Sequence, residues 1–391
     1  MILTIITFLI ILSILVLVHE FGHFSLARLF GVKVDEFGLG LPPRAIGWQK
    51  RVLPLTGLQK VDNTITTNEN PHTIFSLNWL PLGGFVKIKG EQGEAANDTD
   101  SFASKPLWQR GIILAAGVTL NFLFTIFLFS IGYLIGLPQV IENDLPGAII
   151  TNNKIQITEV LKDSPAQQAN LAVGDIILAI NNSHPQTVTE VQQLIATQSG
   201  QKVTLEIKRG EALITSEVTP NYLPELTKVG LGVSLMRSGT VSYQPFLALW
   251  HGLLTTIDLL MQIISGLFNL LFNLLTWQKV GVDIVGPVGI AVLTGSMVKL
   301  GWVYVLQFTA ILSLTLAVMN FLPLPALDGG RFLFLVIAKI RGKSVDQKLE
   351  NFIHNLGFIL LLGLILIVTC KDLYHLQDKF IGLWHSLTNF F

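Results

Sequence analysis

Four stretches of the chain are apolar along their whole length and contain no charged residue. They are residues 1–18, 111–136, 303–322 and 355–370. A helix that crosses a bilayer needs about 20 apolar residues, so each stretch predicts a transmembrane helix. The first stretch has neither the positive amino-terminal region nor the small-residue cleavage site of a signal peptide. We therefore expect it to be an uncleaved helix that ends near Arg28.

A fifth apolar stretch, residues 246–276, differs because polar residues interrupt it at regular steps of three or four. This spacing predicts a helix with one polar stripe. Such a helix can lie in the plane of the membrane interface, and we favour this arrangement over a full crossing. The polar positions are His251, Thr255, Asp258, Gln262, Ser265, Asn269, Asn273 and Thr276.

The polar segment 137–245 is long enough for one small domain, and its part 155–236 alternates between strand-like and helix-like patterns. Apolar residues at every second position predict strands, and apolar residues on one helical face predict helices. The predicted strands are 155–160, 176–182, 202–209, 212–218 and 230–235. Segment 164–175 predicts a short helix and a glycine turn, and segment 187–199 predicts a helix.

Composition supports a membrane protein and argues against nucleic-acid binding. Charged residues make up 13% of the chain, against roughly 25% in soluble proteins. The 26 basic and 26 acidic residues leave no basic excess, which nucleic-acid binding usually requires. The single cysteine, Cys370, excludes an internal disulfide and is most simply a small apolar residue.

The distribution of Lys and Arg predicts the orientation. Segment 28–110 contains ten, segment 137–300 contains nine, and the short segment 331–350 contains five. Basic residues concentrate on the cytoplasmic side, which places 28–110 and 331–350 in the cytoplasm. Both termini and the small domain are then outside.

A candidate metal site begins where the first apolar stretch ends, at His19-Glu20-Phe21-Gly22-His23. Helix positions i and i+4 share a face, so both imidazoles can reach one metal ion, with Glu20 placed to take a proton from water. Ionisable residues at membrane depth are costly and mark functional sites.

Catalytic zinc needs a third protein ligand and an open position. Asp328 is the clear candidate, because it follows the third apolar stretch after a segment broken by Pro323 and Pro325. Irregular backbone at membrane depth is tolerated where it is buried or lines a cavity. His354 is a weaker rival ligand, and a simple turn residue at 328 is the alternative.

The two parts of this site constrain the topology. The histidines lie at the carboxyl end of the first span and Asp328 at that of the third, so these spans must run in the same direction. Four spans satisfy this requirement, whereas a full crossing by 246–276 would reverse the span before Asp328.

The His-Glu-x-x-His motif, with Asn-x-x-Pro-x-Pro-x-Leu-Asp-Gly at 320–329, resembles the site-2 protease family of intramembrane zinc metalloproteases. A PDZ-like insert between spans two and three resembles its bacterial regulator-of-sigma-E protease branch. The resemblance implies that His19, His23 and Asp328 bind Zn²⁺, that Glu20 is the catalytic base, and that Asn320 helps to hold the substrate backbone.

Two further elements resemble parts of that family. Segments 37–40 and 82–89 are similar to its G-x-G element and to its membrane-dipping β-hairpin, whose edge pairs with an unwound substrate; an ordinary amphipathic hairpin is the alternative. Segment 164–182 is similar to PDZ domains, with the carboxylate-binding turn placed last, as in circularly permuted forms; a lid that only packs is the alternative. The substrate-binding candidates are Phe85, Val86, Lys87, Ile88, Gly230, Leu231, Gly232 and Val233.

The expected fold is therefore a mainly α polytopic membrane protein with four transmembrane helices, a membrane-dipping β-hairpin and an inserted, β-rich, circularly permuted PDZ domain. We expect four parts: 1–136, with spans one and two; 150–238, the PDZ-like domain; 239–300, the interfacial helix; and 301–391, with spans three and four. Val118 stands where the family usually has proline, and there is room for one PDZ domain where well-known members have two.

The expected activity is that of a zinc metalloendopeptidase in the bacterial inner membrane. The resemblance implies that it cuts single-span proteins already trimmed by another protease, such as an anti-sigma factor or remnant signal peptides, with a peptide or carboxyl terminus at the PDZ groove. A transporter would instead spread ionisable residues over several spans and show internal repeats. A silent PDZ scaffold would lack part of the metal set, and a surface protease for soluble peptides remains a third alternative.

Overall fold

A computed structural model of the chain describes residues 2–50, 58–61, 72–142, 145–223, 228–276, 278, 285–343 and 345–388. The chain forms two compact units. One unit comprises Met1–Phe129 and Gly252–Phe391, and the other comprises Ser130–His251. The predicted PDZ-like domain, 150–238, lies within the second unit, and each unit is described by itself below.

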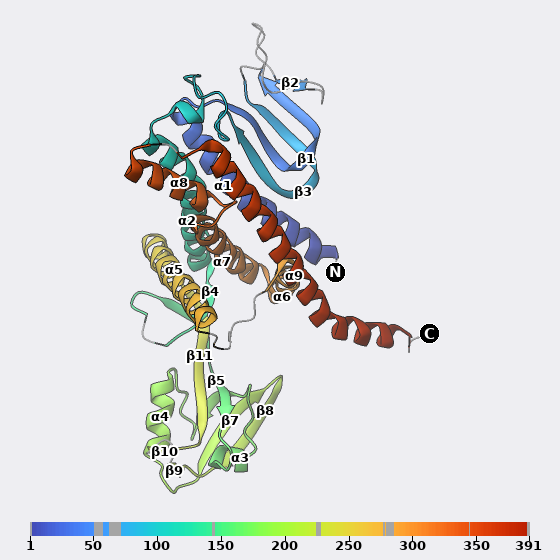
Figure 1. Ribbon diagram of the computed structural model, residues 1–391. Helices are drawn as coiled ribbons and strands as arrows, with labels where there is room; N and C mark the ends of the chain where they lie inside the picture. The colour runs from blue at the N-terminus through green and yellow to red at the C-terminus, as the bar shows by residue number, and fades with distance from the viewer. Residues whose placement is uncertain are drawn as a thin grey trace. The chain divides into compact units, whose positions relative to one another are not determined.

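Helices dominate the first unit (Figure 1). Long apolar sequences without interior proline favour them, since a helix satisfies its own backbone hydrogen bonds in lipid. The helices, two of which continue into the second unit, are α1 (Ile2–Leu29), α2 (Leu107–Ile135), α5 (Pro245–Leu275), α6 (Pro287–Leu300), α7 (Trp302–Phe321), α8 (Asp328–Arg341) and α9 (Gln347–Thr388).

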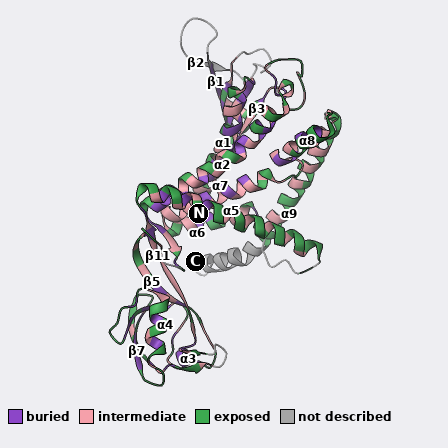
Figure 2. Ribbon diagram, turned by 90° about the vertical axis from the view of Figure 1, so that its left-hand side faces the viewer, coloured by how far each residue is buried: buried purple, intermediate pink, exposed green. Residues whose placement is uncertain are grey.

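Within the described residues, five helices are long and apolar enough to cross a membrane: α1, α2, α5, α7 and the first part of α9. Four of them coincide with the uncharged stretches. The fifth is α5, whose most apolar window contains no buried residue. Figure 2 shows exposed and half-buried residues along α5 and α9. Length and composition do not decide between a crossing and an interfacial α5, so the four-span topology remains a prediction.

A small sheet accompanies α1, formed by β1 (Val34–Lys50), β2 (Leu58–Val61) and β3 (Ile74–Ile88) in the order β2-β1-β3. Residues 36–39 of β1 are in register with 74–77 and also with 84–87 of β3. Because this part of β1 lies between the two parts of β3, segment 84–88 forms an edge of the sheet within the described residues. The predicted hairpin is thus part of a larger sheet that also contains the Phe37–Gly40 segment.

An apolar cluster fixes this sheet to the helices. It joins Ala27 of α1, Ile88 of β3, Ile113 of α2 and Leu335 of α8, which are all at most 9% exposed. The sheet is therefore held at the end of α1 that carries the two histidines.

The second unit is a six-stranded sheet of order β4-β11-β5-β6-β7-β8, with two short helices and a small β9–β10 pair. Every predicted strand in this segment corresponds to an observed one. The elements are β4 (Leu137–Val140), β5 (Ile149–Val160), α3 (Pro165–Gln168), β6 (Ile176–Ile180), α4 (Val188–Ala196), β7 (Val203–Arg209), β8 (Ala212–Val218), β9 (Asn221–Leu223), β10 (Lys228–Gly230) and β11 (Val233–Ser242).

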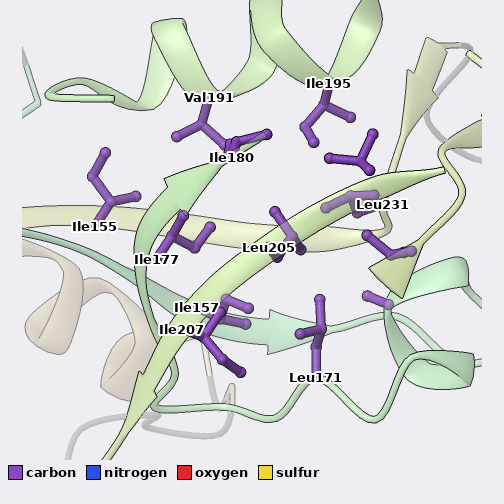
Figure 3. Close-up of a cluster of buried hydrophobic side chains, with 13 residues drawn as sticks. Ile155, Ile157, Leu171, Ile177, Ile180, Val191, Ile195, Leu205, Ile207 and Leu231 are labelled. Carbon is purple, nitrogen blue, oxygen red and sulfur yellow. The ribbon is translucent and has the colours of Figure 1, made fainter. Parts of the chain in front are cut away.

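Figure 3 shows the core of this unit, where α4 covers the sheet with Val191 and Ile195. Alternate residues of β7, Val203, Leu205 and Ile207, face the same core and are at most 1% exposed. This alternation is expected of a sheet with one buried face. The polar-apolar pattern of the sequence thus accounts directly for the core.

Candidate metal centre

Two histidines on one face of α1 form the base of the site. His19 and His23 are 5% and 6% exposed, and their Nε2 atoms lie 3.2 Å apart. The i, i+4 spacing brings the two rings together, as expected for a continuous helix.

Asp328, the first residue of α8, completes a triangle with these histidines. Its Oδ2 atom lies 2.9 Å from His19 Nε2 and 3.2 Å from His23 Nε2. Ligands at about 2.0–2.1 Å around a tetrahedral zinc ion lie about 3.3 Å from one another. The three side chains therefore have the spacing of a metal shell, and they form the one His/Cys/Asp/Glu cluster of this kind within the described residues.

The tautomer of His23 decides what faces the centre of this triangle. His23 Nδ1 lies 2.8 Å from the carbonyl oxygen of Ile113, which can only accept, so Nδ1 donates. In a neutral His23 the lone pair on Nε2 then points towards Asp328 and His19. Such convergence of electron-pair donors suits a metal cation among them, and the Nδ1 bond is the outer-shell contact typical of metal-binding histidines.

Glycines provide the space in which the site forms. A Cβ atom at Gly117 of α2 would lie 2.5 Å from His23 Nε2 and 2.8 Å from His19 Nε2. A Cβ at Gly22 would lie 2.4 Å from the carbonyl oxygen of Ala116, so small residues let α1 and α2 approach closely. In the sequence, Gly117 is only one residue of the second apolar stretch, 111–136. Contact with the histidines is what gives Gly117 its importance.

Glu20 and Asn320 both lie at this centre. The Glu20 carboxylate lies near the Val86 backbone amide and near His23 and Asp328. Asn320 Nδ2, in the last turn of α7, lies 3.4 Å from His19 Nε2. A carboxylate and a carboxamide therefore flank the three candidate ligands.

The edge segment of the sheet, 84–88, lies beside the part of α1 that carries Glu20. A Cβ atom at Gly83 would lie 3.2 Å from the Val16 side chain, and Val86 lies next to Glu20. Val86 is half-buried and packs on the apolar cluster with Ile88, whereas Lys87 is exposed. Phe85 is half-buried and its ring covers Gly38. The structure thus brings Val86 of the predicted hairpin close to Glu20, while Phe85 and Ile88 pack within the sheet and the apolar cluster.

The predicted rival ligand His354 does not join the cluster. Its Nδ1 atom accepts a hydrogen bond from the backbone N–H of Ala326 at 3.0 Å. Its ring lies 5.5 Å from that of Phe334. His354 therefore contacts the segment before Asp328 and not the histidines.

The predicted carboxylate-binding turn, Gly230–Val233, belongs to the second unit. Gly232 adopts a positive φ of 78°, and its carbonyl oxygen accepts a hydrogen bond from Leu161 N at 2.8 Å. Leu231 is 4% exposed in the core of that unit, and its carbonyl oxygen accepts from Ala166 N. The turn is thus fixed between β10 and β11.

Comparison with known proteins gives a consistent match. The model of peptidase family M50 matches residues 7–71 and 60–364. A protein of Clostridium perfringens is 33% identical over 364 residues, covering 92% of this chain and 96% of the relative. The zinc metalloprotease RasP of Geobacillus kaustophilus is 29% identical, covering 95% and 97%. The regulator of sigma-W protease RasP of Bacillus subtilis is 28% identical, covering 95% and 99%.

Among solved structures, the PDZ domain of an SdrC-like protein of Listeria innocua matches 21% of this chain and 92% of its own length. The identity is 20% and the TM-score is 0.20.

Proposed function

The chain belongs to peptidase family M50, the site-2 proteases, and is a zinc metalloprotease of a membrane; we propose that it hydrolyses peptide bonds within the transmembrane segments of single-span proteins. The observation that carries this proposal is the position of the ligand triangle. His19 and His23 lie within the apolar helix α1, and Asp328 follows the apolar helix α7. A peptide bond that is cleaved at these three ligands must therefore lie next to the apolar helices.

His19, His23 and Asp328 hold the zinc ion, and the fit rests on their spacing, on the His23 tautomer and on the space at Gly117. When bound, zinc supplies a Lewis acid and lowers the pKa of water to about 7. The protein keeps the ligands in place through the Ile113 carbonyl and through the helix contact at Gly22.

Glu20 acts as general base and then as general acid. It takes a proton from the attacking water and passes it to the nitrogen of the leaving amine. Its position next to both histidines and Asp328 supports this role. A general acid–base residue of this kind contributes about 10²- to 10⁴-fold to the rate.

The edge segment of the sheet pairs with the substrate backbone through Phe85, Val86, Lys87 and Ile88. A helical substrate hides its peptide bonds in its own hydrogen bonds, so it must unwind before hydrolysis. An edge strand can pair with the freed groups. The registers that leave 84–88 outermost, and the proximity of Val86 to Glu20, support this role. Asn320, close to His19, helps to hold the same backbone.

The second unit binds a peptide or a new carboxyl terminus at the edge of β11. Val233–Met236 is in register with β5 on one side, while β4 pairs with β11 only from Ser238 onward. Within the described residues the other edge of 233–236 is therefore not paired with a strand. It follows directly on the Gly230–Val233 turn, which is the arrangement needed for strand addition.

The substrates are single-span proteins that another protease has already trimmed, such as an anti-sigma factor or remnant signal peptides. The Bacillus subtilis relative is named as a regulator of sigma-W protease, which supports the first class. The protein lies in the bacterial inner membrane with four spans and an interfacial α5. Both termini and the second unit are outside the cytoplasm, as the basic residues predict.

The test compares the parent protein with Glu20→Gln and, as a matched control, with Glu217→Gln, whose side chain is 63% exposed in the second unit. Each protein is purified in detergent, its zinc content is measured, and it is incubated with a labelled single-span substrate. We expect about one zinc per chain in all three proteins and cleavage within the span by the parent and the control. Glu20→Gln should lose about 10²- to 10⁴-fold in rate.

Loss of zinc from Glu20→Gln would contradict the assignment of Glu20 as a base that does not bind the metal. Zinc binding without cleavage of any trimmed substrate by the parent would favour a scaffold role. Absence of zinc from the parent would overturn the site itself.

A further inference from the structure

Asp328 is presented by an irregular segment, Leu322–Leu327, that joins α7 to α8. Pro323 and Pro325 have no backbone N–H. The N–H of Leu324 bonds to the Leu322 carbonyl at 2.7 Å, and the N–H of Leu327 bonds to the Leu324 carbonyl at 3.3 Å. Ala326 differs, because its N–H leaves the segment and donates to His354 Nδ1 of α9 at 3.0 Å.

Ala326 also has a backbone conformation that needs support from its surroundings. Its φ angle is +76°, a region that residues with a Cβ rarely adopt and that persists when the surroundings fix it. Ala326 stands two residues before Asp328. The direction in which the chain enters α8 therefore depends on this turn.

One face of α9 packs directly on the turn. Gly357 lies three residues after His354, so both are on the same helical face. A Cβ at Gly357 would lie 2.3 Å from the Pro325 Cβ atom, which shows how closely the helix approaches. His354 also contacts the Phe334 ring of α8, so it contacts both the turn and the helix that Asp328 begins.

We propose that His354 is a positioning residue for the metal centre. Its Nδ1 atom accepts the Ala326 N–H, so its proton is on Nε2, and the bond holds the turn that places Asp328 Oδ2 at 2.9 and 3.2 Å from the two histidines. His354 itself is not a ligand, because Nδ1 is engaged by Ala326 and the cluster of possible metal ligands in the described residues does not include it. The inference rests on the proposed role of Asp328 as a ligand.

The test separates the hydrogen bond from the packing of the ring. His354→Phe keeps an aromatic ring and removes the acceptor, while His354→Asn keeps an acceptor oxygen near the Nδ1 position and removes the ring. Zinc affinity is measured on the full-length proteins by competition with a chelator, together with kcat, KM and the thermal unfolding temperature. We expect His354→Phe to bind zinc about 10- to 100-fold more weakly, as for other outer-shell residues of metal sites, with kcat reduced and KM little changed. His354→Asn should stay within about 3-fold of the parent in zinc affinity.

A second substitution addresses the backbone. Ala326→Gly permits the positive φ without steric cost, so in the His354→Phe background it should restore part of the zinc affinity. If His354→Phe binds zinc as tightly as the parent, the positioning role is wrong. Equal losses in His354→Phe and His354→Asn would overturn it too, because packing would then explain both. A parent protein that binds no zinc would instead contradict the proposed function, so the two failures are distinguishable.

Discussion

Each unit contains a buried or half-buried aspartate at its centre, but the neighbours of the two differ. Asp175 in the second unit is 0% exposed and accepts hydrogen bonds from Arg209 Nε at 2.7 Å, Arg209 Nη2 at 2.8 Å and Ala172 N at 2.8 Å. Asp328 in the first unit is 25% exposed and faces two imidazole nitrogens. The Asp175 carboxylate accepts hydrogen bonds from permanent donors. The Asp328 carboxylate faces imidazole nitrogens that can themselves bind a metal ion.

This difference separates a structural carboxylate from a chemical one. Arg209 is a permanent cation with a planar donor set that suits a carboxylate, so the protein alone satisfies Asp175. The lone pair of a neutral His23 faces Asp328, and the protein supplies no further cation at that point in the described residues. Folding therefore completes the Asp175 site, whereas the proposed ligand set leaves a zinc ion to complete the Asp328 site.

An Asp→Asn substitution should thus reduce zinc binding at Asp328 and the stability of the second unit at Asp175. Asp328→Asn should weaken zinc binding by roughly 100- to 1,000-fold, if about 10–16 kcal/mol is shared among four ligands, and should leave the second unit folded. Asp175→Asn should keep the zinc but destabilise the second unit by roughly 2–3 kcal/mol, since Arg209 is 42% exposed and can be hydrated. Zinc competition and hydrogen exchange on the full-length proteins measure the two effects. Loss of zinc from Asp175→Asn would contradict the separation.

Gly117→Ala tests whether the first site depends on space as strongly as on charge. The added methyl group would lie 2.5 Å from His23 Nε2, so a ligand must move. A displacement of about 1 Å at a reacting centre costs on the order of 100-fold in kcat/KM, and we expect a loss of that size with weaker zinc binding.

The matched control is Gly363→Ala in α9, where a Cβ would meet nothing within 4 Å. It should keep full activity and raise helix stability by roughly 0.5–1 kcal/mol. Similar activities for the two alanine variants would show that the site tolerates the extra volume.

The sequence predicts His19, His23 and Asp328 as candidate ligands because the signals at each end of this cluster are local. His19 and His23 are spaced by one helical turn, and Asp328 follows a proline-broken segment beside an apolar helix. The roles of Gly117 and His354 were not predictable in the same way. Each role depends on a contact between helices distant in the sequence, so the sequence offered His354 only as a rival ligand and Gly117 only as part of an apolar stretch.

The second unit shows the same limit. Alternating patterns predict β7 and its neighbours, because one face of the sheet is buried. The pairing of β4 with the far end of β11 has no such signal, since it joins Leu137–Val140 to residues about one hundred positions later. The polar segment 151–154 likewise lies within β5 without alternation of apolar residues. Pairing with β11 keeps it extended.

Acid should weaken the second unit through Asp175, and the sign follows from the direction of its pKa. The hydrogen bonds from Arg209 hold the pKa of Asp175 below its ordinary value, burial opposes this, and the Ala172 amide reinforces it. A carboxyl whose folded pKa is lowered contributes stability that is present above the unfolded value, about 3.9, and is lost as pH falls through the folded pKa. The slope is at most about 1.4 kcal/mol per pH unit for one proton.

The stability of the second unit between pH 6 and pH 3 is measured by hydrogen exchange on the full-length chain, corrected for the intrinsic exchange rate. The stability difference between the parent and Asp175→Asn should be constant above about pH 5 and should shrink below about pH 4. Glu217→Gln is the control, because its Lys202 partner is 77% exposed and exposed pairs contribute about 0–1 kcal/mol. A stability difference that stays constant down to pH 3 would mean that the Asp175 charge does not stabilise the second unit. The contrast between Asp175 and Asp328 would then fail.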